Sequence, residues 1–359
     1  DEVSLADNLE ALRDYALVPR VLVDVAGRSQ HTTLFGRTYS VPFGIAPMGS
    51  AALFAYRGDI ALARAAGAHD MPFVLSASSL IAMETVKAEG PTAWFQAYMP
   101  GEKPRIQALI ERVTAAGYDT LVVTVDVPVS GNRENNARRG FATPLRPSLR
   151  LLMDVGTHPR WLVGTVLRTV VNHGLRRFEN RDADRGPPIP SRGLRHVTGP
   201  RDRLTWEHLK FIRSRWRGNL VIKGILSAED ARFARDAGAD GIIVSNHGGR
   251  QLDGAIAPLR VLPEIARAAG PMTVMLDGGI RRGSDVLKAL ALGAHLAFVG
   301  RPFLFAAICG EAAVCRAAGL LSEEIDRNMA LLGITRLDQL TPDHIRQIRN
   351  ERPSMPARQ

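Results

Sequence analysis

The sequence predicts an α/β fold, a single (β/α)8 TIM barrel with a long basic insertion between strands 4 and 5. Short apolar runs alternate with helix-like stretches along the 359 residues, which is typical of a parallel sheet with helical crossovers. The apolar runs number eight, the strand count of a closed barrel. We expect strands at residues 41–46, 73–76, 93–98, 120–126, 220–223, 241–245, 273–277 and 296–300.

Helical patterns lie between these runs and support one domain over residues 1–359. We expect helices at 59–68, 103–116, 228–237, 258–268 and 284–292. Glycine follows several of them, as it often does after the last helical residue: Gly117, Gly238, Gly270 and Gly293. Barrels of this class routinely form one domain of about 250 residues, so the length does not require a second domain.

Nearly every expected strand ends in a polar residue or a glycine. Polar groups are costly to bury without a partner, and barrel enzymes build their active sites at the carboxyl ends of the strands. The sequence therefore predicts an active site at that end. In strand order the residues are Pro47, Met48 and Gly49; Ser76; Gln96 and Tyr98; Thr124 and Asp126; Lys223; Ser245 and His247; Asp277 and Gly279; Gly300 and Arg301.

The insertion, residues 140–200 approximately, carries most of the positive charge. Residues 133–203 contain 15 Arg, no Lys and 6 acidic residues, nearly the whole formal charge of +10. The segment lacks aromatic residues interleaved for base stacking, which argues against nucleic-acid binding. Its apolar part, 149–171, is broken by Asp154, Pro159 and Arg160, so we do not expect a membrane span. Two interpretations remain: a segment lying on an anionic membrane surface, or a loop covering the active site.

The cysteine content and the expected lack of a signal peptide indicate the cellular compartment of the protein. Cys309 and Cys315 are the only cysteines, and their spacing predicts neither a disulfide framework nor a metal site. We expect no signal peptide, and there is no uninterrupted apolar stretch of about 20 residues. We expect a cytoplasmic enzyme, either free or peripheral on the inner face of the cell membrane.

The most informative segment follows the sixth expected strand and reads Ser245-Asn-His-Gly-Gly-Arg-Gln-Leu-Asp253. A neutral imidazole takes a proton near physiological pH, and a guanidinium binds a carboxylate through two parallel hydrogen bonds. His247 and Arg250 therefore suit acids whose reactive carbon is next to the carboxylate. The alternative is a turn in which both side chains only satisfy backbone groups.

Two glycine-rich segments follow strands seven and eight, where barrels commonly bind phosphate. They are Asp277-Gly-Gly-Ile-Arg-Arg-Gly283 and Gly300-Arg-Pro302. Glycine allows the backbone to approach an anion, and Arg301 can clamp it. Lys223, in an apolar run, is expected either to form a structural ion pair or to stabilise negative charge on a reduced cofactor ring.

These motifs together resemble the FMN-dependent L-2-hydroxy acid oxidase and dehydrogenase family over essentially the whole chain. The family includes glycolate oxidase, lactate oxidase and membrane-associated L-mandelate dehydrogenase. The resemblance implies that His247 is the catalytic base with Asp126 as its charge partner, and that Arg133 and Arg250 receive the substrate carboxylate. It also implies that Tyr98 hydrogen-bonds the substrate. The FMN ring would contact Pro47, Met48, Gly49, Ser76, Gln96, Thr124, Lys223 and Ser245, and its ribityl phosphate Asp277, Gly279, Arg281, Gly300 and Arg301.

The chain departs from the family pattern in two places. Its opening, residues 1–8, resembles a stretch that normally lies some tens of residues into these proteins, so a leading segment with a further active-site tyrosine is expected to be missing. Gly49 and Ser78 stand where larger residues often narrow the substrate pocket. The resemblance therefore favours a larger or aromatic substrate such as (S)-mandelate, with L-lactate as the alternative. A quinone or oxygen would accept the electrons, and a homotetramer is implied.

Two other classes stay open. An FMN- or phosphate-binding barrel isomerase would share the glycine-rich phosphate segments, but it has no need for the set formed by His247, Arg250 and Arg133. A basic membrane-binding adaptor would account for the insertion but not for the polar strand ends. A colourless purified protein would favour the adaptor.

Overall fold

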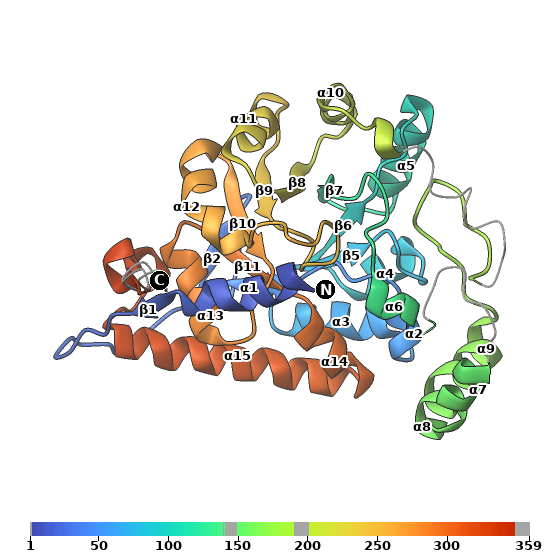
Figure 1. Cartoon of the computed structure of the whole chain (residues 1–359), viewed down its shortest axis with the longest axis horizontal. Coiled ribbons are helices and arrows are strands. Elements are labelled where there is room, and N and C mark those ends of the chain that lie inside the picture. Colours follow the sequence, from blue (N-terminus) through green and yellow to red (C-terminus); the bar gives the residue numbers. More distant parts are fainter. Residues whose placement is uncertain (1, 139, 141–148, 190–200, 349–359) are drawn as a thin grey trace, which may run out of the picture.

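A closed barrel of eight parallel strands forms the centre of the protein in the computed structural model (Figure 1). The structure describes residues 2–138, 140, 149–189 and 201–348. Around the ring the strands follow chain order and β11 closes on β4. They are β4 (Phe43–Ile45), β5 (Phe73–Ser76), β6 (Ala93–Ala97), β7 (Thr120–Thr124), β8 (Asn219–Ile225), β9 (Gly241–Val244), β10 (Thr273–Asp277) and β11 (Leu296–Val299). The predicted (β/α)8 barrel is confirmed, and the expected strands differ from these by at most three residues at an end.

The strands read as continuous apolar runs because both of their faces are buried. Val74 of β5 packs inside the barrel, whereas its neighbours Phe73 and Leu75 pack toward the helices. This alternation follows from the two-residue period of a strand. The barrel interior is therefore a packed core, and only the strand ends are available for polar chemistry.

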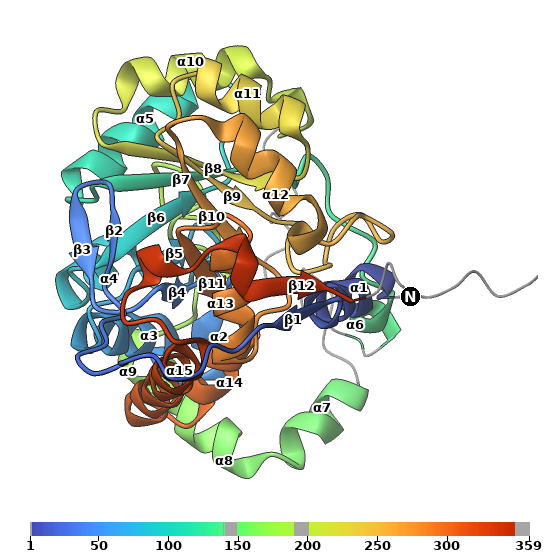
Figure 2. The same ribbon diagram turned by 90° about the vertical axis from the view of Figure 1, so that its left-hand side faces the viewer.

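A hairpin that the sequence interpretation did not include contributes to this interior. It consists of β2 (Thr32–Leu34) and β3 (Arg37–Tyr39), and Leu34 and Tyr39 join the interior cluster. The Trp94 indole N–H donates to the Tyr39 hydroxyl at 3.2 Å. Trp94 is near the start of β6, so the hairpin covers the end of the barrel where the strands begin. Figure 2 shows it on the side opposite the N-terminal helix α1 (Val3–Arg13).

Helices surround the barrel, and the five expected ones are present with ends within one residue of the expectation. These are α3 (Gly58–Ala68), α5 (Lys103–Ala115), α11 (Ala228–Asp236), α12 (Pro258–Ala269) and α13 (Gly283–Ala291). The sequence interpretation missed α4 (Met83–Glu89), α10 (Trp206–Arg215), α14 (Arg301–Ile308) and α15 (Glu311–Leu332). The 22-residue α15 packs along α13, α14 and α3 (Figure 1).

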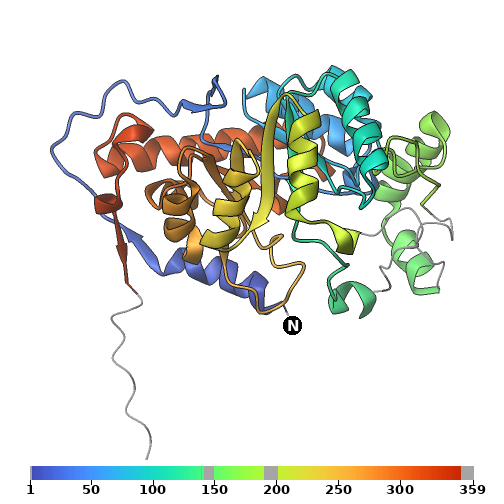
Figure 3. The same cartoon turned by 90° about the horizontal axis from the view of Figure 1, so that it is seen from above.

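The segment between β7 and β8 forms a helical arm at one side of the barrel (Figures 1 and 3). After α6 (Glu134–Arg138) it contains α7 (Leu149–Gly156), α8 (Pro159–Trp161), the π-helix η1 (Leu162–Leu167) and α9 (Arg168–His173). Parts of the predicted 140–200 insertion, residues 141–148 and 190–200, lie outside the described residues. Asp154 and Arg160, which interrupt the apolar run, lie inside helices, and the helical arm itself is interrupted at residues 157–158. No helix of the described chain is both long and apolar enough to cross a membrane.

Strands near the two ends of the described chain pair on the opposite side of the barrel from the arm (Figure 3). Strand β1 (Tyr15–Leu17) pairs antiparallel with β12 (Ile345–Gln347), and α1 immediately precedes β1. This pairing holds α1 against the barrel, where its buried face includes Ser4 and Asn8. Polar residues on a buried face need partners, and those partners lie in the candidate site.

Candidate active site at the carboxyl ends of the strands

His247, Asp126 and Tyr98 meet at the barrel mouth, although they follow three different strands. The Nδ1 atom of His247 lies 3.0 Å from Asp126 Oδ1, and the Tyr98 hydroxyl lies 3.5 Å from His247 Nε2. Both members of the His247–Asp126 pair are largely buried. A carboxylate at Nδ1 favours the tautomer with the proton on that nitrogen, so Nε2 is left to accept a proton.

The electrostatics of Asp126 support this assignment. Burial by itself would raise the pKa of Asp126, but the His247 hydrogen bond and the Lys223 charge outweigh burial, so the pKa is lowered. Asp126 therefore stays ionised and stabilises positive charge on the imidazole. Its second oxygen, Oδ2, is buried without a hydrogen-bond partner among the described residues.

The backbone at His247 is left-handed, which is uncommon for a residue other than glycine. His247 has φ 60°, and Gly248 and Gly249 follow with φ 65° and 72°. The hydroxyl of Ser245 accepts from the His247 N–H at 3.0 Å, and the Asn246 side chain accepts from the Gly249 N–H at 3.0 Å. Strained conformations of this kind persist where the surroundings hold them, and they cluster at functional sites.

Helix α1 supports this turn. Asn8 and Asn246 exchange two side-chain hydrogen bonds, of 2.9 and 2.7 Å, and both residues are buried. The Ser4 N–H donates to Asp253 Oδ1 at 2.9 Å. A Cβ atom at Gly249 would lie 2.6 Å from the Leu5 nitrogen, so only glycine fits there. Sequence reasoning missed this contact, although two polar residues four apart in a helix were a usable signal.

Arg133 and Arg250 come together beside the His247 turn. The Arg133 guanidinium donates to the Arg250 carbonyl at 3.1 Å and to Gln251 Oε1 at 3.2 Å. Within the described chain neither arginine is ion-paired with an acid. The sequence-predicted pair is thus adjacent, and both side chains are exposed at the mouth. Two neighbouring guanidinium groups without a carboxylate partner form a suitable receptor for one.

Lys223 forms a buried ion pair. Its Nζ lies 2.8 Å from Asp277 Oδ2 and donates to Ser245 Oγ at 2.7 Å. Burial would lower the pKa of Lys223, but the charges of Asp277 and Asp126 outweigh burial and the pKa is raised. The ammonium therefore stays charged. It has three donors and these two contacts occupy two of them, so the ion pair does not exclude a contact with a bound group.

Several buried polar atoms at the strand ends lack partners among the described residues. They include Gln96 Nε2, Thr124 Oγ1 and Asp277 Oδ1. The Ser76 hydroxyl donates to Gln96 Oε1 at 3.1 Å, which orients the Gln96 amide with Nε2 on the other side. Unsatisfied buried polar atoms are costly, and a set of them in one place indicates a missing ligand. A flat ring with its own donors and acceptors would satisfy this set.

A candidate anion site lies beyond β10 and β11. Burial, followed by the charges of Arg281 and Arg250, lowers the pKa of Arg301, so three guanidinium groups act on one region. Gly300 precedes α14 directly, and the amino end of a helix favours an anion. Arg301 donates to the Gly248 carbonyl at 2.9 Å, which joins this site to the His247 turn. Glycine is required at position 279 for steric reasons, because a Cβ atom there would lie 2.4 Å from the Asn8 carbonyl oxygen.

Gly49 and Ser78 face each other after β4 and β5. A Cβ atom at Gly49 would lie 2.9 Å from the Ser78 Cβ, and the Ser50 N–H donates to the Ser78 carbonyl at 3.0 Å. Pro47 and Met48 precede Gly49 in the same loop. A side chain at position 49 would therefore force Ser78 to shift.

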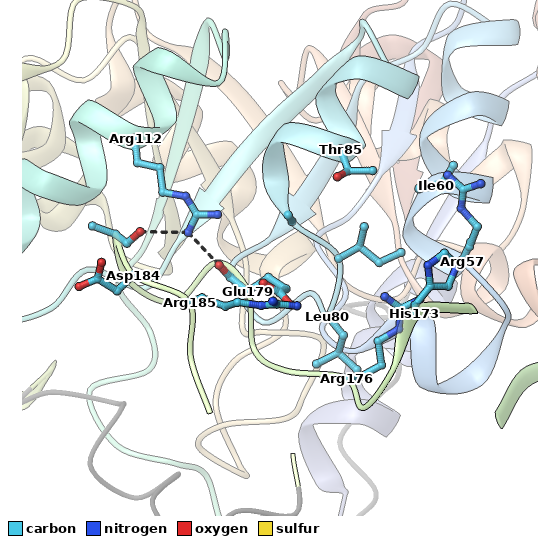
Figure 4. Close-up of a pocket in the computed structure, with 13 residues that line it drawn as sticks. Arg57, Ile60, Leu80, Thr85, Arg112, His173, Arg176, Glu179, Asp184 and Arg185 are labelled. Carbon is cyan, nitrogen blue, oxygen red and sulfur yellow. Dashed lines mark hydrogen bonds and ion pairs between the residues drawn. The ribbon is translucent and has the colours of Figure 1, made fainter. Parts of the chain in front are cut away.

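A cavity of about 600 Å³ lies outside this site, between the barrel and the segment that returns from the arm (Figure 4). Most of its charged groups are paired: Arg57 with Glu89, Arg112 with Glu84, and Arg185 with Glu179. Arg112 also donates to the Glu179 carbonyl, as Figure 4 shows. None of the residues lining the cavity is a sequence-predicted site residue.

Comparisons with known proteins agree with this geometry. The family described as FMN-dependent dehydrogenase matches residues 1–347. An L-lactate dehydrogenase of Caulobacter vibrioides is 40% identical, with 93% of this chain and 87% of that protein covered. An L-lactate dehydrogenase of Xanthomonas euvesicatoria pv. vesicatoria is also 40% identical, over 98% and 90%.

Solved structures of two related enzymes are also similar to this chain. The crystal structure of (S)-mandelate dehydrogenase, described as a monotopic membrane protein, superimposes with a TM-score of 0.90. It is 36% identical, over 97% of this chain and 92% of that chain. A mandelate oxidase variant superimposes with a TM-score of 0.77 at 35% identity, over 94% and 88%.

Proposed function

Because this chain belongs to the FMN-dependent dehydrogenase family and oxidises 2-hydroxy acids with FMN, we propose that it acts on an L-2-hydroxy acid whose substituent is larger than methyl, such as (S)-mandelate. The observation that carries the proposal is the group formed by His247, Asp126 and Tyr98 beside two arginines without acidic partners.

The residues present suit FMN at both ends of the cofactor. Gln96, Thr124 and Lys223 would hold the ring, since two of them have buried polar atoms without partners and the third keeps a donor in reserve. The positive region at Arg281 and Arg301, with the amino end of α14, would hold the phosphate. Pro47, Met48, Gly49, Ser76, Ser245, Asp277, Gly279 and Gly300 complete the proposed set. Bound FMN supplies an acceptor for the two electrons that leave the substrate.

Substrate binding begins at the carboxylate. Arg133 and Arg250 would hold it through paired hydrogen bonds, and the Tyr98 hydroxyl would donate to the same end of the substrate. Holding the carboxylate fixes the neighbouring carbon near His247 Nε2, because the Tyr98 hydroxyl lies 3.5 Å from that atom. Orientation of this kind supplies much of the rate enhancement in bound reactions.

Proton transfer would use His247. Its Nε2 accepts the proton that the substrate loses, while Asp126 at Nδ1 stabilises the resulting imidazolium. Asp126 is suited to this role because its pKa is lowered and it stays ionised at neutral pH. Lys223, whose raised pKa keeps it charged, stabilises negative charge that develops beside the ring.

The preference for a larger substituent rests on Gly49 and Ser78, which leave their side of the site without bulky side chains. L-lactate is the second candidate, favoured by two L-lactate dehydrogenases at 40% identity. The test is an anaerobic titration of the yellow protein with L-mandelate, L-lactate and glycolate, followed through the oxidised flavin band. Bleaching at the lowest concentration by L-mandelate supports the larger substituent. Bleaching by L-lactate alone would leave the reaction in place and overturn the size argument.

The electron acceptor is proposed to be a membrane quinone rather than oxygen. The arm exposes Leu149, Met153, Val163 and Leu167, and its helices also carry the exposed Arg160 and Arg168. Exposed apolar side chains beside arginines suit an anionic membrane surface on the cytoplasmic side. The similar (S)-mandelate dehydrogenase is described as monotopic. Assembly as a homotetramer belongs to the same proposal, supported by the family resemblance and tested by the mass from analytical ultracentrifugation.

A further inference from the structure

Two arginines that the proposed reaction does not use lie beside its substrate site. Arg181 and Arg201 belong to the chain that returns from the arm toward β8. The Arg201 guanidinium carbon lies 4.6 Å from the centroid of the Tyr98 ring. That ring is in turn 6.4 Å from the His247 ring, centroid to centroid. Arg201 is therefore one aromatic ring away from the proposed base.

Two other arginines on and around this segment, Arg105 and Arg185, are paired with acids. Arg105 binds Asp182 through two donors, and Arg185 lies 2.8 Å from Glu179. Arg181 and Arg201 have no ion pair with an acid in the part of the chain that the structure describes. Arg181 lies over the Phe178 ring, at 3.6 Å from its centroid, and its Nε is buried without a hydrogen-bond partner.

The two cations act on each other as well as on Tyr98. Burial, followed by the Arg201 charge, lowers the pKa of Arg181 to about 10. Two guanidinium groups that are partly removed from water, with no counter-charge, destabilise the folded chain unless something binds them. The charges of Arg201 and of Arg133 both act on Tyr98. Tyr98 is thus close to the proposed carboxylate receptor and is in contact with Arg201 of this second pair.

We propose that Arg181 and Arg201 receive a second anionic group, at the far end of the substrate's substituent, so that the preferred substrate is a 2-hydroxy dicarboxylate. The inference rests on the proposed function, because it assumes that Arg133 and Arg250 hold the first carboxylate. A guanidinium matches a carboxylate in geometry as well as charge, and binding would supply the missing counter-charge. The substituent must be long enough to extend past Tyr98, so the substrates tested carry either a short carbon chain or a phenyl ring.

The test compares substrates that differ only in the terminal group. The FMN-loaded enzyme is assayed with (S)-2-hydroxyglutarate against (S)-2-hydroxypentanoate, and with 4-carboxymandelate against mandelate. We expect kcat/KM to be at least about tenfold higher for the charged member of each pair. Arg181→Gln and Arg201→Gln should each remove most of this difference in kcat/KM by raising KM for the charged substrates. The kcat/KM of the neutral substrates should stay unchanged. Arg201→Lys should retain part of the difference, which guards against a misfolded glutamine variant.

Arg185→Gln is the matched control, because Arg185 lies on the same segment but is paired with Glu179. It should leave all ratios unchanged. A second readout needs no turnover: glutarate should perturb the flavin spectrum at a lower concentration than butyrate, and Arg201→Gln should abolish the difference. Equal binding of the two acids, or neutral substrates that match the charged ones in every variant, would overturn the inference and leave the proposed function standing. Failure of every 2-hydroxy acid to bleach the flavin would instead remove the proposed function.

Discussion

His247 has a left-handed backbone and a ring held at Nδ1, and the two features depend on each other. The turn from His247 to Gly249 directs the imidazole toward Asp126, and the Ser245 hydroxyl and the Asn246 side chain hold the turn. The strain at one residue is thus supported by hydrogen bonds from its neighbours. Changes to the ring and changes to its support should therefore have different effects.

Replacement of the ring is expected to abolish turnover without loss of cofactor. His247→Gln should lower kcat by about three orders of magnitude or more, because no other group at Nε2 can accept the proton. FMN content, measured from the absorbance ratio of the purified protein, should stay normal, since His247 does not belong to the proposed phosphate site. Near-normal turnover in this variant would exclude His247 as the base.

Replacement of Arg250 is expected to affect binding instead. Arg250→Lys keeps the charge but loses the planar pair of donors, so KM should rise about tenfold or more with a smaller change in kcat. Steady-state kinetics with the best substrate measure both quantities. A variant with unchanged KM would show that Arg250 does not receive the carboxylate. Arg282→Lys is the control, since Arg282 is exposed and paired with Glu324 on the outside of the barrel.

At the scale of elements, α1 acts as a support for the catalytic turn. Asn8→Ala removes both hydrogen bonds between Asn8 and the buried Asn246 amide, which should lower the free energy of unfolding by about 1–3 kcal/mol. We also expect a lower kcat with little change in KM, because the turn that holds His247 is loosened. Arg13→Ala, on the exposed side of the same helix, serves as the control. If the two variants have equal stability and equal kcat, α1 does not support the turn.

A buried carboxyl in α3 should make stability depend on pH. Burial raises the pKa of Asp59 from 3.8 to about 6. The folded chain therefore holds this proton more tightly than the unfolded chain, so the free energy of unfolding should fall as pH rises from about 4 to about 6. The largest contribution is about 3 kcal/mol. Urea unfolding across this range measures it.

Asp59→Asn should remove this part of the pH dependence, since an amide does not ionise. Asp236→Asn, at an exposed position of α11, provides the control and should follow the parent protein. If the difference between Asp59→Asn and the parent does not change with pH, the Asp59 carboxyl does not titrate in this range.

At the scale of the whole molecule, the proposed membrane contact in the arm would be separate from the candidate active site. It is anchored by the Trp161 indole, which donates to the Leu53 carbonyl at 2.9 Å, and by Tyr56, whose hydroxyl lies 3.1 Å from His173 Nε2. The exposed side chains of η1 and α9 lie beyond these anchors. A substitution on the exposed side of the arm should therefore alter membrane binding without altering the barrel.

Vesicle flotation tests this separation. The enzyme should bind vesicles that contain anionic lipid more strongly than neutral ones, and Val163→Glu should weaken binding several-fold by placing a charge in the interface. Flavin reduction by the substrate in solution should stay unchanged. Leu331→Glu, at an exposed position of α15 far from the arm, is the control. Equal flotation of the parent and Val163→Glu would show that the arm is not the membrane contact.

The barrel, and the gathering of most candidate site residues at one end of it, could be predicted from the amino-acid sequence. Apolar runs such as 73–76 and 273–277 carry their own strand signal, and parallel strands place polar ends such as Gln96, Thr124 and Asp277 at one edge. The local pattern was sufficient to predict the fold because a barrel repeats one unit, a strand followed by a helix. It did not reveal the β2–β3 hairpin or the short α4, whose runs are too brief for a clear periodic signal.

Only the tertiary structure decided which polar groups have partners. Lys223 proved to be paired with Asp277, Asn8 with Asn246, and Arg185 with Glu179. Arg181 and Arg201 resemble the other arginines of the basic segment in the sequence, yet they lie near Tyr98 and pair with no acid among the described residues. The reason is physical: whether a charge is satisfied depends on distances across the fold, and sequence spacing fixes such distances only within one helix or strand.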